Sequence, residues 1–128
     1  MVELIPHNPT EGIYPTDGWI HAMEVRGAQR TLYLAGTMGL DPEGVPGKDL
    51  AEQLVLVWTN VRTILASAGM TVDNIVRVTS YLRDVAFAEA NGRARVEALG
   101  GRNVPTTAVV VQTLEDGWLV ELEVVAVG

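Results

Sequence analysis

Hydrophobic and polar residues follow two different periodicities along this chain. In residues 49–68 the apolar positions recur at steps of three and four, which places them on one face of a helix: Leu50, Leu54, Val57, Trp58, Val61 and Leu65. Asp49 suits the N-terminal cap of this helix, and Gly69 suits its end. A second helix is predicted over about residues 85–99, capped by Asp84.

Five short strands are predicted, of which the last two are rich in valine and threonine. They are 20–26, 31–35, 75–82, 106–113 and 119–127. Residues 27–30 are expected to form a hairpin turn between the first two strands. Residues 1–19 carry three prolines and two glycines and are expected to form an irregular arm. The order ββαβαββ in 128 residues predicts one α+β domain, a mixed sheet with both helices on one face.

A sheet covered by helices on one side leaves a second face to be covered. The strand pattern places Val109, Val111 and Val125 on that face. Exposed apolar patches of this kind usually mark an interface, so an oligomer is expected.

Composition narrows the classes of function. The formal net charge is -7 and the nine basic residues are scattered along the chain, so nucleic-acid binding is not expected. With no cysteine and two isolated histidines, His7 and His21, neither a metal site nor another cofactor is expected. The N-terminus lacks a signal-peptide pattern, and no apolar run is long enough to span a bilayer. A soluble cytoplasmic protein without membrane contact is therefore expected.

Six segments, taken in order, resemble one family. They are Leu34–Gly44, Gln53–Gly69, Ile75–Asp84, Phe87 with Asn91, Val104–Ala108 and Leu119–Val124. Together they are similar to the Rid (YjgF) family of reactive-intermediate deaminases over about residues 19–127. The resemblance implies a chorismate-mutase-like fold in a homotrimer, with sheets lining the interior and helices outside. It also implies that the last strand lies inside the sheet and does not form a hairpin with the strand before it.

The resemblance also implies a chemistry. Catalytic members hydrolyse enamines or imines of amino acids to ketoacids and ammonia, in clefts between subunits. Their signature arginine, two residues after a proline, grips the substrate carboxylate. Here Pro105 is followed at that distance by Thr107, whose hydroxyl cannot replace a planar cation. The chain therefore resembles a subgroup without this arginine, and weak activity on the usual 2-imino acids is expected. Arg102 either reaches the same cleft or is a solvated loop arginine.

Glu121 matches the family glutamate that holds the attacking water and is the expected catalytic residue. Glu123 lies two residues further along the same strand, so the two carboxylates are expected on one face. A carboxylate in a partly desolvated cleft can act as a general base. Two alternatives stay open: both glutamates are solvated charges, or both form ion pairs at an interface.

Four other positions match places that line the family's cleft. Trp19 falls where the family has an aromatic residue, although Tyr14 is a competing match. Gly36 and Thr37 fall where the family has Gly-Gln. Asn91 matches a cleft-lining asparagine, with a position on the helix surface as the alternative. With Thr107, these residues are the expected substrate-binding set.

Two functions from different classes follow. The first is a trimer whose clefts bind a small unsaturated or carbonyl-bearing metabolite and hydrolyse an imine or enamine to a carbonyl compound and ammonia. The second is a non-catalytic trimer that binds small molecules or acts as a chaperone. The sequence does not identify the substrate.

Overall fold

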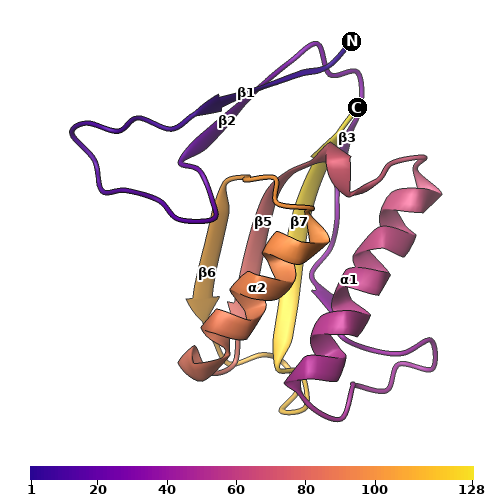
Figure 1. Ribbon diagram of the computed structural model, residues 1–128. Helices are drawn as coiled ribbons and strands as arrows, with labels where there is room; N and C mark the ends of the chain where they lie inside the picture. The colour runs from indigo at the N-terminus through magenta and orange to yellow at the C-terminus, as the bar shows by residue number, and fades with distance from the viewer.

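Two helices lie against one face of a β-sheet in the computed structural model, which describes all 128 residues (Figure 1). Helix α1 spans Leu50–Ser67 and helix α2 spans Ala88–Ala98. The other face of the sheet, turned away from the viewer in Figure 1, carries no helix and is called the open face below. The predicted α+β arrangement is confirmed. Neither helix is long and apolar enough to cross a membrane.

The last strand lies in the middle of the sheet, as the resemblance implied. The strands in spatial order are β3 (Thr31–Tyr33), β7 (Val120–Val127), β5 (Ile75–Leu82) and β6 (Thr106–Val110), with β4 (Thr37–Met38) also paired to β7. Strands β5 and β6 are parallel and the other pairs are antiparallel, so the sheet is mixed. Strands β6 and β7 follow each other in the chain without being neighbours. The predicted strand over 106–113 is shorter than expected and ends at Val110.

Local capping fixes the start of α1 and the start of the short turn that precedes α2. The Asp49 side chain accepts a hydrogen bond from the backbone N–H of Glu52 at 2.9 Å, which satisfies a free donor at the start of α1. Gly69 follows the helix with φ of 69°, a conformation that glycine adopts without the cost of a Cβ clash. Asp84 caps a short 3-10 turn, Val85–Phe87, and this turn leads directly into α2.

The predicted hairpin between residues 20–26 and 31–35 is wrong. Strand β2 (Ala22–Arg26) pairs instead with β1 (Glu3–His7), and the two form a separate antiparallel ribbon. Strand β3 pairs with β7, so residues 27–30 connect two sheets. The arm expected to be irregular over 1–19 therefore contains a strand, and only its remainder is irregular. Pro6 fits there because β1 has a single neighbour and tolerates a missing donor.

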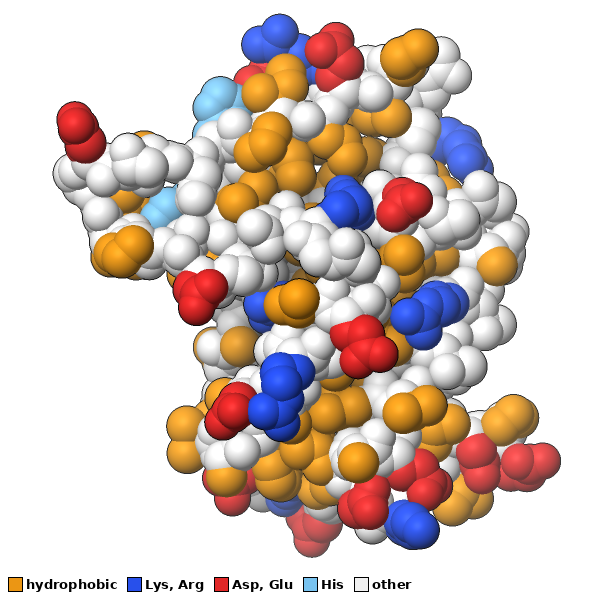
Figure 2. Space-filling model, in the orientation of Figure 1, with side chains coloured by type: hydrophobic (Ala, Val, Ile, Leu, Met, Phe, Trp, Pro, Cys, Tyr) orange, Lys and Arg blue, Asp and Glu red, His pale blue; other side chains and the backbone are white.

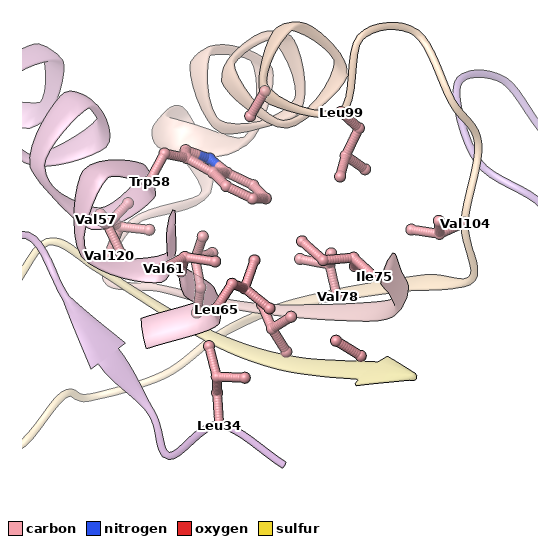
Figure 3. Close-up of a cluster of buried hydrophobic side chains, with 14 of the residues drawn as sticks. Leu34, Val57, Trp58, Val61, Leu65, Ile75, Val78, Leu99, Val104 and Val120 are labelled. Atoms are coloured by element: carbon pink, nitrogen blue, oxygen red, sulfur yellow. The ribbon is translucent and has the colours of Figure 1, made fainter. Parts of the chain in front are cut away.

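The core fills the space between the helices and the sheet. Val57, Val61 and Leu65 of α1 are fully buried and face Ile75 and Val78 of β5 (Figure 3). Leu99 and Val104, on either side of the turn after α2, close one end of the same cluster. Burying one such side chain contributes about 1.5–3 kcal/mol, so this cluster holds the two layers together.

Candidate functional site

The open face carries the side chains that alternate with the core residues of β5 and β7. Tyr81 pairs in register with Glu121, and Thr79 pairs with Glu123. Their neighbours Ser80 and Leu122 are buried on the helix side. Glu121 and Glu123 therefore share the open face, as the period of a strand requires.

Glu121 lies against Gly36 in a hollow at one end of this face. The hollow has a volume of about 290 Å³ and is lined by Gly36, Tyr81, Glu121, Glu123 and residues 111–114. A Cβ at residue 36 would collide with the Glu121 carboxylate, so only glycine leaves the space that this carboxylate occupies. Glu121 is half-buried and its side chain forms no ion pair within the chain.

Tyr81 and Glu123 form a hydrogen bond in the same hollow. The Tyr81 hydroxyl donates a hydrogen bond to Oε1 of Glu123 at 2.8 Å. This bond, together with partial desolvation and the charges of the two glutamates, raises the pKa of Tyr81 above its ordinary value. The phenol therefore stays neutral through the physiological range. Sequence analysis did not identify Tyr81, although the alternation of Arg77, Thr79 and Tyr81 along one strand marks a polar face.

Polar contacts fix the loop that walls the hollow. Arg83 donates to the Thr113 hydroxyl at 2.6 Å and pairs with Asp116 at 2.7 Å. From α1, the buried Gln53 donates to the carbonyl of Gly117 at 2.8 Å. Gln53 also accepts from the backbone N–H of Leu119 at 2.9 Å. The loop that leads into β7 is thereby held in place before the strand that carries Glu121.

Thr107 lies on the open face of β6, two strands from Glu123. The Nη2 of Arg77 on β5 donates to the Thr107 hydroxyl at 3.1 Å. Arg102, considered as a cation for this region, donates instead to the backbone carbonyls of Val72 at 3.0 Å and Ile75 at 3.1 Å. Arg102 is half-buried and tethers its loop to these two carbonyls. Within one chain it is therefore neither a solvated loop arginine nor a side chain that reaches Thr107.

The other predicted site residues do not line the hollow that holds Glu121 within one chain. Thr37 is buried opposite the core residue Leu122, and its hydroxyl donates to the Ala35 carbonyl at 3.0 Å. Asn91 is 2% exposed, which excludes the helix-surface alternative, and its Oδ1 has no hydrogen-bond partner.

Both aromatic candidates lie in the arm beside the start of β6. The rings of Trp19 and Tyr14 pack edge-on against His21, with centroids 5.3 Å and 5.0 Å from it. Ile20 forms a bridge with Pro105, which sets this cluster next to the strand that carries Thr107. The two aromatic matches are thus parts of one cluster. No group of three His, Asp or Glu side chains is close enough to hold a metal ion.

This fold, in which two helices cover one face of a mixed sheet, defines a class of small α+β protein that is represented among solved structures. The crystal structure of a Rid-family protein of unknown function, YyfB from Yersinia pestis, superposes with a TM-score of 0.83, 29% identity and coverage of 98% of both chains. Residues 10–128 match the family model described as endoribonuclease L-PSP.

Sequence relatives agree with this assignment. A RutC family protein from Pyrococcus abyssi is 34% identical over 98 residues, which cover 74% of this chain and 76% of the relative. A protein from Capra hircus named 2-iminobutanoate/2-iminopropanoate deaminase is 32% identical over 101 residues, covering 77% of this chain and 73% of the relative. The chain belongs to the Rid (YjgF) family.

Proposed function

We propose that this protein hydrolyses a small imine at its carbon–nitrogen double bond, or an enamine after tautomerisation to the imine, with Glu121 as the residue that holds and deprotonates water. The observation that carries the proposal is the half-buried Glu121 carboxylate, which lies over Gly36 in a hollow lined also by a neutral phenol. A relative named as a 2-imino-acid deaminase supports the reaction class.

The chemistry balances with water as the only co-reactant. Glu121 accepts a proton from water as the water oxygen adds to the imine carbon, and it returns this proton to the imine nitrogen to give a carbinolamine. The hydroxyl proton of the carbinolamine then passes to the nitrogen as the C–N bond breaks, which yields a carbonyl compound and ammonia. A positioned general base typically contributes about 10²–10⁴-fold to such a rate.

The proposal includes a homotrimer with sites in clefts between subunits. A hollow of 290 Å³ that is open to solvent does not exclude water from a bound ligand by itself. A neighbouring copy that covers the open face would supply the missing wall. The small-molecule metabolite is then the partner, and the protein requires no cofactor.

A second candidate is a non-catalytic trimer that binds a small molecule or acts as a chaperone. Thr107 favours it, since the signature arginine of the catalytic members is absent there. Ribonuclease activity, which the family description names, is not proposed. On the helix side of the molecule basic side chains are scattered singly among acidic ones (Figure 2), and Arg77 is the one basic side chain on the open face of β5, β6 and β7.

The experiment that separates the two candidates is Glu121→Gln, which keeps the size of the side chain and removes the base. Ammonia release is measured from a panel of imines generated in situ, with and without an amino-acid carboxylate. Glu43→Gln, at an exposed loop glutamate whose side chain forms no hydrogen bond, is the matched control. Turnover should fall by about 10²–10⁴-fold in the first variant alone. Unchanged turnover in an intact Glu121→Gln assembly would place the chemistry elsewhere, and tight ligand binding without turnover would favour the second candidate.

A further inference from the structure

A hollow lies between helices α1 and α2, on the side of the molecule away from the open face. Its volume is about 430 Å³, which is within the range of small-molecule sites. On this side of the molecule apolar side chains gather between the helices, with single charged side chains around them (Figure 2). A neighbouring copy that covers the open face would leave this hollow accessible.

The floor of the hollow is apolar and contains one unsatisfied polar group. Leu54, Trp58 and Ala98 are buried there. The Nε1 of Trp58 lies on the edge of the indole that faces α2 (Figure 3), and it has no hydrogen-bond partner in the chain. From α2, the apolar lining is Ala90, Ala94 and Ala98, whose methyl groups cannot accept a hydrogen bond. An apolar group fits this floor, and an acceptor that enters with it would satisfy the indole N–H.

Two opposite charges without ion-pair partners lie at the rim. Arg62 of α1 and Glu97 of α2 are exposed and line the hollow from its two walls. They form no ion pair with each other or with any other residue of the chain. The third charged residue of the lining, Arg93, is paired with Glu89 at 2.8 Å. The rim therefore offers one free cation and one free anion on either side of an apolar floor.

We propose that this hollow binds a free α-amino acid with an apolar side chain. Such a molecule carries a carboxylate, an ammonium group and an apolar side chain on one carbon atom. Arg62 binds the carboxylate through its paired N–H donors, Glu97 binds the ammonium group, and the side chain lies on Leu54 and Trp58. Trp58 and Arg62 are four residues apart on α1 and so lie on neighbouring turns of one face. The same carboxylate is therefore the acceptor nearest to the indole N–H.

Charge complementarity selects this class of ligand over simpler ones. A carboxylic acid without an amine would leave Glu97 unpaired, and an amine without a carboxylate would leave Arg62 unpaired. The inference does not depend on the proposed function, because Glu121 lies on the opposite side of the sheet. Binding at the helices is measurable without any turnover.

The test compares leucine with two probes that each lack one of its charges. These are 3-methylbutylamine, which lacks the carboxylate, and 4-methylpentanoate, which lacks the ammonium group. Binding is followed by the NMR signal of the Trp58 indole N–H, assigned with Trp58→Phe. Leucine should shift this signal and should bind about fivefold or more tightly than either probe.

Two variants assign each charge of leucine to its partner. Arg62→Gln should lower the affinity for leucine to that of 3-methylbutylamine and leave the binding of this amine unchanged. Glu97→Gln should lower the affinity for leucine to that of 4-methylpentanoate without weakening the binding of this acid. Arg26→Gln, at an exposed arginine of the β1–β2 ribbon, is the control and should bind leucine as the wild type does.

Three outcomes would overturn the inference. One is equal affinity for leucine and both probes, and another is leucine binding that neither Arg62→Gln nor Glu97→Gln weakens. The third is an unmoved Trp58 signal at millimolar leucine, whether or not leucine binds elsewhere. Loss of turnover in Glu121→Gln should leave leucine binding intact, so failure of the proposed function and failure of this inference are separate results.

Discussion

The carboxylate of Glu121 occupies the space that a side chain at Gly36 would fill. A larger residue at position 36 is therefore incompatible with the observed position of this carboxylate. Glu121 comes from the middle strand β7, and Gly36 comes from the segment between β3 and β4. The position of the proposed base therefore depends on the absence of one carbon atom on a neighbouring segment.

Gly36→Ala is expected to displace the Glu121 carboxylate and to abolish most turnover while the fold is kept. Circular dichroism and ammonia release, measured on the same sample, check this expectation. Gly92→Ala is the control, because a Cβ there meets no atom within 4 Å and Gly92 lies within helix α2. That control should raise the free energy of unfolding by about 0.5–1 kcal/mol, since alanine is the better helix former. Full activity in Gly36→Ala would show that the carboxylate position is unimportant.

Light scattering should give about three times the 13.8 kDa chain mass at micromolar concentration. The open face exposes apolar side chains, with Tyr33 77% exposed and Val109 42% exposed, and these require a partner. A charge placed on that face, as in Val109→Asp on the edge strand β6, should shift the mass toward that of one chain. A stable wild-type monomer would contradict both the assembly and the shared cleft.

The hydrogen bond from Tyr81 to Glu123 predicts a pH dependence of known sign. Because the folded-state pKa of Tyr81 is raised, the bond stabilises the fold below the ordinary tyrosine pKa of about 10. That contribution is lost as pH rises through the folded-state value. Glu123→Gln should lower the pKa of Tyr81, as followed by the NMR shift of its ring carbons. An unmoved titration would mean that the bond does not form in solution.

Asn91→Leu separates a structural asparagine from one that binds ligand. Asn91 is buried with an unpartnered Oδ1, and an unsatisfied buried polar group costs about 1–3 kcal/mol. Leucine has nearly the same size, so the free energy of unfolding in urea should rise. Ammonia release from the imine panel should stay unchanged if Asn91 has no contact with the ligand. A loss of stability would show that its amide has a partner in the assembled protein.

Features set by neighbouring residues in the chain were predictable from the sequence, and features set by distant ones were not. The Asp49 cap and the Gly69 end of α1 depend on local chemistry, and both were predicted. Residues 27–30 were predicted as a hairpin turn, but the strands on either side of them pair with partners from opposite ends of the chain. Periodicity does not encode that choice.

The candidate site shows the same contrast between features set by neighbouring residues and features set by distant ones. The shared face of Glu121 and Glu123 follows from spacing along one strand. The contact of Arg77 with Thr107 joins residues that are 30 positions apart, and it depends on the register of a parallel pair. The two backbone carbonyls that bind Arg102 likewise come from a separate segment and leave no local pattern.

The central place of β7 has a consequence for how the chain folds during synthesis. Its residues, Val120–Val127, are synthesised after β3, β4 and β5, yet all three strands pair with them. Until then, α1 and β5 exist without the strand that completes their core, and their apolar faces stay exposed. Contacts between such distant parts of a chain form slowly and leave intermediates prone to aggregation. A nascent chain whose synthesis has not reached residue 120 lacks the middle of its sheet.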